Sequence, residues 1–104
     1  MSLDALIRRL RLRDLRTLAS VARGGSMRKA AQDLHLSLPA VSRSIADREA
    51  TVGLQLLVRT TSGAVPTAYG EALVRRSRVL FDELEAGMRE LAQLADPGTG
   101  DVRL

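Results

Sequence analysis

The segment 26–45 most constrains what this chain can fold into, because its pattern is typical of two short helices joined by a tight turn. The first helix is expected to start at Ser26, a capping residue that follows two glycines. Behind this cap, four apolar residues are spaced so that they share one helical face: Met27, Ala30, Ala31 and Leu34. We therefore predict a helix over about residues 26–34.

The second half of the segment carries its own helix signals. Ser37 is a further capping residue, and Pro39 stands in the first turn, where its missing N–H costs nothing. Three apolar residues then continue at helical spacing: Val41, Ile45 and Val52. We predict a helix over about residues 38–52, which the small alanines of the first helix allow to cross closely. Such a helix-turn-helix places its second helix in the DNA major groove, so the pattern predicts DNA binding.

Elements on both sides of this segment complete a small domain. A helix is expected before it, stopped by Gly24 and Gly25, and residues 2–11 are compatible with a continuation of that helix. After it, apolar residues on either side of a Ser-Gly turn predict a β-hairpin over about residues 55–66, which in this position is a wing. The predicted fold class is mainly α: a winged helix-turn-helix domain over residues 1–66, made of three helices and a two-stranded wing.

A long helix is predicted next, over residues 67–95, with Thr67 as its cap. Its apolar residues recur in two series of seven-residue steps, on a face too broad for one small domain to cover. We expect it to pair with a second copy of the chain in coiled-coil-like packing; the alternative is that it folds back on its own core. The expected dimer interface consists of Leu73, Val74, Leu80, Phe81, Leu84, Met88 and Leu91. Residues 96–104 are expected to be a hinge that leads to a further domain, absent from this chain.

The net charge of +4 is unevenly distributed along the chain. Residues 1–66 hold 11 arginines or lysines against 5 aspartates or glutamates, which gives +6. Residues 67–104 hold 5 against 7, which gives −2. A local positive field suits a polyanionic partner, because each neutralised phosphate releases counterions. The alternative, for so modest a charge, is an ordinary solvated surface.

Composition argues against several other functions. The chain has no cysteine, and its one histidine, His35, has no second imidazole to share a metal, so we expect a turn residue there and neither a metal site nor a disulfide. No apolar run could cross a bilayer and no signal-peptide core is present, so a cytoplasmic protein without a membrane partner is expected. No nucleophile–base pair or cofactor loop stands out, so we expect no enzyme and no cofactor. The competing hypothesis is a helical protein-interaction module that grips a partner with its long helix.

The order of these elements and the residues within them resemble the N-terminal DNA-binding part of LysR-type transcriptional regulators. The residues that carry the resemblance are Leu15, Arg16, Gly25, Ser26, Met27, Ala30, Ala31, Leu34, Ser37, Pro39, Ala40, Val41, Ser42, Arg43, Ile45, Glu49, Val52, Gly53, Leu56, Leu57, Arg59, Thr60, Gly63, Val65, Thr67 and Gly70. The resemblance implies a bacterial homodimer on double-stranded DNA, with a tetramer as an option for the full-length protein. It also implies a C-terminal effector-binding domain of two α/β lobes, where a small-molecule effector would bind, so this chain is expected to be a fragment.

The docking geometry of the helix-turn-helix assigns the expected DNA contacts. Arg43 can donate two hydrogen bonds to a guanine, and Ser42 can reach a base or a phosphate. The residues expected to face bases are Leu38, Pro39, Ser42 and Arg43. The residues expected to hold the DNA backbone are Ser26, Arg28, Lys29, Ser37, Ala40, Arg59 and Thr60.

Four residues depart from the family pattern: Leu38, Arg48, Leu57, where the family usually has Phe, and Pro66, where it usually has Leu. Leu38 stands where the family commonly has Gln, which can bond base edges, whereas Leu offers only an apolar contact. Arg48 stands where the family usually has Leu, on the core face of its helix. We expect Arg48 either to extend to solvent or to pair with a carboxylate. The candidate partners are Asp33, Asp47 and Glu49, which are otherwise expected to be solvated.

Overall fold

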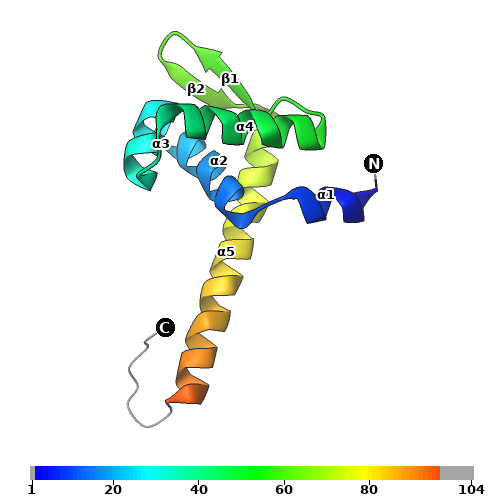
Figure 1. The fold of residues 1–104 in the computed structure, drawn as a ribbon, viewed down its shortest axis with the longest axis vertical. Coiled ribbons are helices and arrows are strands. Elements are labelled where there is room, and N and C mark those ends of the chain that lie inside the picture. Colours follow the sequence, from blue (N-terminus) through cyan, green and yellow to red (C-terminus); the bar gives the residue numbers. More distant parts are fainter. Residues whose placement is uncertain (1, 97–104) are drawn as a thin grey trace.

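The computed structural model of the chain describes residues 2–96 (Figure 1). The helices and strands in this range are α1 Leu3–Arg9, α2 Leu12–Gly24, α3 Met27–Leu34, α4 Leu38–Val52, β1 Leu57–Thr60, β2 Gly63–Pro66 and α5 Ala68–Ala95. The mainly α fold, the helix-turn-helix and the wing are therefore confirmed. The predicted hinge lies, apart from Asp96, outside the described residues.

The head of the molecule is built from α2, α3 and α4, with the hairpin packed against one side of it (Figure 1). Its interior is aliphatic, as a chain with only two aromatic residues requires. The buried core consists of Leu18, Val21, Ala30, Ala31, Val41, Ile45, Leu56, Leu57 and Ala64. Each large side chain among these contributes about 1.5–3 kcal/mol by leaving water. This core fixes α3 and α4 relative to each other, and so defines the helix-turn-helix.

The helix ends of this motif follow the capping residues of the sequence. The Oγ of Ser26 accepts a hydrogen bond from the backbone N–H of Lys29 at 3.1 Å, and the Oγ of Ser37 accepts one from Ala40 at 3.2 Å. Each serine thereby satisfies one of the N–H groups that the first helical turn leaves unpaired. At the other end of α4, Gly53 adopts the left-handed conformation expected of a residue that ends a helix.

Residues 2–11 are helical over most of their length, as the sequence allows, but they form a separate helix, because the chain breaks between α1 and α2. Leu10 and Arg11 are extended rather than helical. The break is stabilised from another helix: Nη1 of Arg48, in α4, donates a hydrogen bond to the carbonyl oxygen of Arg9 at 2.9 Å. This carbonyl belongs to the last turn of α1 and has no partner within that helix.

The hairpin has a two-residue turn and sits close to the turn between α2 and α3. Its strands are antiparallel, with Thr60 opposite Gly63. The backbone N–H of Ala64 donates to the carbonyl oxygen of Gly25 at 2.9 Å. Gly63 has a φ of 146°, and a Cβ there would overlap that same oxygen, so this position requires glycine.

The start of α5 is fixed to the segment before the hairpin. Thr67 caps the helix by accepting from the N–H of Gly70, and it donates its own hydroxyl to the carbonyl oxygen of Gln55 at 2.7 Å. The backbone N–H of Thr67 also donates to Leu56 at 3.0 Å. A Cβ on Gly70 would overlap that same carbonyl of Leu56, so glycine allows α5 to approach this closely.

The first half of α5 belongs to the head. Leu73 and Val74 are half-buried against the core, and Ser77 is buried. The guanidinium of Arg16 in α2 lies 4.7 Å from the centre of the Phe81 ring, a cation–π contact. The whole apolar series of α5 was expected to face a second copy of the chain. Leu73 and Val74 instead pack against the chain's own core.

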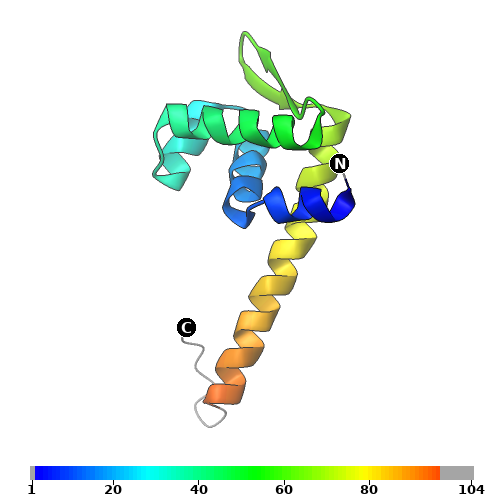
Figure 2. The ribbon, with the colours of Figure 1, turned by 45° about the vertical axis from the view of Figure 1, so that its right-hand side comes forward.

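The second half of α5 extends away from the head without support from the rest of the described residues (Figure 2). At 28 residues the helix is about 42 Å long. From Val79 onward, the large apolar residues exposed on α5 are Val79, Leu80, Leu84, Met88, Leu91 and Leu94. Among residues 2–96, no helix is both long and apolar enough to cross a membrane.

Candidate nucleic-acid interface

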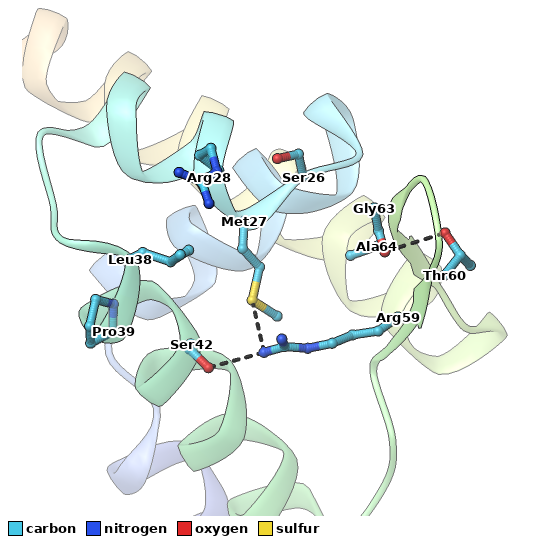
Figure 3. A pocket seen from close by; sticks show the side chains of 10 residues that line it. All are labelled: Ser26, Met27, Arg28, Leu38, Pro39, Ser42, Arg59, Thr60, Gly63 and Ala64. Carbon is cyan, nitrogen blue, oxygen red and sulfur yellow. Dashed lines mark hydrogen bonds between the residues drawn. The ribbon is translucent and has the colours of Figure 1, made fainter.

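A cleft of about 420 Å³ lies where α3, α4 and the hairpin meet (Figure 3). It brings together seven residues that the sequence assigned to DNA contact: Ser26, Arg28, Leu38, Pro39, Ser42, Arg59 and Thr60. These side chains come from three elements that are separate in the sequence. The fold therefore gathers most of the expected contacts on one side of α4.

Arg59 spans this cleft from the hairpin to α4 (Figure 3). Its Nη2 donates to the Oγ of Ser42 at 3.1 Å, and the same nitrogen lies 3.4 Å from the Sδ of Met27. The guanidinium is exposed and charged, and it has no carboxylate partner among the described residues. The contact links the wing to the helix-turn-helix and leaves a cation free for an anionic ligand.

Two helix N-termini open onto the same cleft. Ser26 caps α3 and lines the cleft together with Arg28, while Leu38 and Pro39 are the first residues of α4. A helix N-terminus carries a partial positive charge and N–H groups that favour an anion. The positive potential of the cleft therefore has two sources: the N-termini of α3 and α4, and the side chains of Arg28 and Arg59.

Four expected contact residues lie outside this cleft. Arg43 and Ala40 line a separate depression on the other side of α4. Arg43 is exposed and points away from the core face marked by Val41 and Ile45. Lys29 is exposed on α3, and the Oγ of Ser37 is occupied by its capping bond. The predicted contacts thus surround α4 on both sides rather than forming one pocket.

The unusual Arg48 is buried and paired, but with a carboxylate other than the three expected partners. Its Nη1 lies 3.1 Å from the Oδ2 of Asp14 in α2, and the two side chains are only 9% and 14% exposed. The other oxygen of Asp14 accepts a hydrogen bond from Ser44 at 2.8 Å. The proposed partners Asp33, Asp47 and Glu49 were wrong, because the core face of α4 packs on α2.

Glu49 has a structural role instead. Its Oε2 accepts hydrogen bonds from the backbone N–H groups of Leu56 and Leu57, at 2.7 and 3.3 Å. This carboxylate anchors the start of the hairpin to α4, and no local pattern in the sequence indicates it. His35 ends α3 in the left-handed conformation, with a φ of 56°, and is the turn residue expected. Within residues 2–96, no group of three or more His, Cys, Asp or Glu could hold a metal ion.

A helix-turn-helix followed directly by a hairpin defines the winged helix-turn-helix class. Residues 12–71 match the sequence profile of the family described as bacterial regulatory helix-turn-helix protein, lysR family. This match covers more than half of the chain, and the chain belongs to the LysR family. It carries the helix-turn-helix DNA-binding domain of that family.

Relatives and solved structures agree with this assignment. A putative transcriptional regulator of Pseudomonas aeruginosa is 42% identical over 93 residues, which are 89% of this chain and 30% of that protein. The HTH-type transcriptional regulator CbbR of Sinorhizobium medicae is 38% identical, over 94% of this chain and 31% of that protein. The chain therefore spans about a third of the length of these relatives.

Two crystal structures of isolated domains cover most of the chain. The CbnR_DBD–DNA complex superimposes with a TM-score of 0.74 at 32% identity, over 82% of this chain and 99% of that one. The BenM_DBD/catB site 1 DNA complex gives a TM-score of 0.80 at 28% identity, over 84% and 98%. Both similar structures are complexes with DNA.

Proposed function

We propose that this chain is the DNA-binding part of a bacterial transcriptional regulator that binds double-stranded DNA sequence-specifically as a homodimer. In this proposal α4 enters the major groove, and the hairpin contacts the flanking backbone or minor groove. The observation that carries it is the cleft between α3, α4 and the hairpin, where Arg28 and Arg59 meet two helix N-termini. Proteins similar to this chain over most of its length are solved on DNA.

The exposed face of α4 supplies the residues that would read sequence. Arg43 is exposed and lines the depression on the other side of α4, where its guanidinium can donate two bonds to the O6 and N7 of a guanine. Leu38 and Pro39 stand at the N-terminal end of α4, where the protein approaches base edges in this class. Phosphate contacts from the cleft would hold α4 in register without carrying sequence information.

The second half of α5 supports a dimer. Leu80, Leu84, Met88, Leu91 and Leu94 are exposed and share one side of this helix, which the head does not cover. Such a face is typical of a helix that packs against a second copy of itself. Leu80, Leu84, Met88 and Leu91 remain as the proposed interface, and Phe81 contributes from the boundary with α2.

The proposal describes a binding protein and not an enzyme. Family membership supports a regulator, which acts on the chromosome and hence in the cytoplasm. The relatives are about three times longer than this chain, so effector binding, and any tetramer, would belong to parts of a longer protein.

DNA binding can be tested by fluorescence anisotropy on a duplex of about three helical turns, across a series of salt concentrations. The logarithm of the binding constant should fall linearly with the logarithm of the salt concentration. Arg28→Ala should flatten this slope by about 0.9, the contribution of one phosphate contact. The matched control is Arg89→Ala on α5, which removes the same charge far from the cleft and should leave the slope unchanged. Binding that ignores salt, or an equal effect of both variants, would contradict the proposal.

A further inference from the structure

The depression on the other side of α4 is as large as the cleft and also basic. It has a volume of about 540 Å³ and lies between α4, the α3–α4 turn and the first turns of α2. Figure 1 shows the hairpin and the start of α2 on opposite sides of α4, so the two hollows flank the same helix. The proposed function uses only Arg43, at the rim of this depression.

The charges around the depression do not cancel. Its lining contains five arginines and two aspartates, a surplus of three positive charges. Asp14 is already engaged by Arg48 and Ser44, which leaves Asp47 as the only other carboxylate in the lining. Arg11 and Arg13 are exposed, and within residues 2–96 neither has an ion pair.

The N-terminal turn of α2 carries two arginines against one carboxylate, that of Asp14. Arg11 is the N-cap of α2 and makes no side-chain capping bond, and Arg13 stands in the first turn. The N-terminus of a helix is its positive end, so cations there are repelled by the helix dipole. An anion bound in front of this turn would remove the conflict, because it would be attracted both by the dipole and by the two guanidinium groups.

A buried donor in the same depression lacks a partner. Arg48 lines the depression with its side chain 9% exposed, and its Nε has no hydrogen-bond acceptor among the described residues. Buried donors are almost always satisfied in folded proteins. An acceptor bound in the depression, or a water held by it, would satisfy this donor.

We propose that this depression binds the sugar–phosphate backbone of DNA on the side of α4 opposite to the wing. The inference rests on the proposed function. A helix in the major groove, which is about 12 Å wide, has one phosphate strand along each of its sides. The cleft with Arg28 and Arg59 would hold one strand, and Arg11 and Arg13 would hold the other. Clamped from both sides, α4 would present Arg43 to the bases in a single register.

The first test compares two double variants that remove the same charge. Arg11 and Arg13 are both replaced by Ala in one, and Arg8 and Arg9, which are exposed on α1 outside the depression, in the other. Anisotropy titrations of the 104-residue chain on a random-sequence duplex should show a salt slope lower by about 1.8 for the first variant, equivalent to two lost phosphates. The control should change the slope by less than half as much. Equal slopes for the two variants would overturn the inference.

Folding is controlled by circular dichroism and by Arg11→Gln with Arg13→Gln, which keeps polar side chains of intermediate length while removing the charge. The glutamine variant should reproduce the lower slope. A slope restored to that of the wild type would assign the loss to the removal of side-chain bulk and would overturn the inference.

The second test locates the contact on the DNA. Single phosphates of a bound duplex are replaced by neutral methylphosphonates, and the affinity for each duplex is measured. The wild-type chain should lose affinity at positions along both edges of the major groove. The Arg11/Arg13 variant should become insensitive along one edge only. The depression is not a DNA-backbone site if methylphosphonates lower the affinity of the wild type along only one edge of the major groove. The same conclusion follows if inorganic phosphate binds in the depression while methylphosphonates along the second edge leave the affinity for DNA unchanged.

These outcomes separate the inference from the proposed function. A wild-type chain that binds DNA and is weakened by Arg28→Ala, but not by the Arg11/Arg13 replacement, would refute only the second phosphate surface. A wild-type chain that binds no duplex would refute both.

Discussion

Arg59 in the hairpin donates a hydrogen bond to Ser42 in α4, with 3.1 Å between Nη2 and Oγ. Both residues were expected to contact DNA, and the structure joins them to each other before any DNA is bound. The bond connects the wing to α4, and it holds a cation at the edge of the cleft. A wing held in this way loses less conformational entropy when it binds DNA.

Removal of the Arg59 side chain should weaken DNA binding about equally for all sequences. A phosphate contact carries no sequence information, so Arg59→Ala should flatten the salt slope by about one unit and leave the ranking of sequences unchanged. Ser42→Ala, which removes the partner but keeps the charge, should leave the slope as it is. Both can be measured by anisotropy on several duplexes. A loss confined to one sequence would show that Arg59 reads a base.

The pair formed by Asp14 and Arg48 should matter for folding. Asp14→Asn leaves the guanidinium of Arg48 buried without a counter-charge, which costs about 3–5 kcal/mol for buried pairs. Urea unfolding at fixed protein concentration should therefore show a lower midpoint with an unchanged m-value. Adding Arg48→Leu to Asp14→Asn should recover much of the loss, because the unpaired charge is then gone. A shift below about 1 kcal/mol for Asp14→Asn would indicate that water already screens this pair.

The exposed face of α5 should hold two copies of the chain together. Leu80→Glu with Leu84→Glu places two charges in the proposed interface and should give monomers in sedimentation experiments. The control is Val79→Glu, which adds a charge at an exposed apolar residue about 100° further round the same helix and should leave the dimer intact. Dimers that survive the double replacement would place the interface elsewhere.

Local signals in the sequence predicted the elements well, because caps and helical spacing act over a few residues. Ser26, Ser37 and Thr67 cap the helices that they were expected to cap. The misses come from contacts between distant segments. Asp14 and Arg48 meet because α2 packs against α4. In the same place, Arg48 donates a hydrogen bond to the carbonyl oxygen of Arg9, at the break between α1 and α2.

The sequence predicted which residues form the candidate site better than it predicted where these residues lie relative to one another. Helical spacing alone placed Ser42 and Arg43 together on the outer face of α4. The structure assigns Ser42 to the cleft beside the wing and Arg43 to the opposite side, because the hairpin borders only one of the two hollows that flank α4. Likewise, Leu73 and Val74 follow the same apolar series as the exposed part of α5, and only the position of the head shows that they belong to its core.

Leu38 is one of the positions at which this chain departs from its family, and it should influence which sequence is bound. Leu38→Gln should shift the preference at one base pair, because an amide can bond an adenine edge where an isobutyl group can only touch a thymine methyl. Binding to a set of single-base variants of a duplex selected from a random pool would measure this shift. A profile that stays unchanged would show that residue 38 does not face a base.

The most direct test of the account is the binding of Arg43→Ala to that same set of single-base variants at fixed salt, beside the wild type and Arg28→Ala. If α4 reads the major groove, Arg43→Ala should lose about 1–3 kcal/mol on the preferred duplex and lose discrimination at one base pair, as expected when a bidentate contact to guanine is removed. Arg28→Ala should lose affinity for every variant alike and keep the discrimination. Equal losses across all variants for Arg43→Ala, with the preference for each base intact, would contradict the placement of α4 in the major groove.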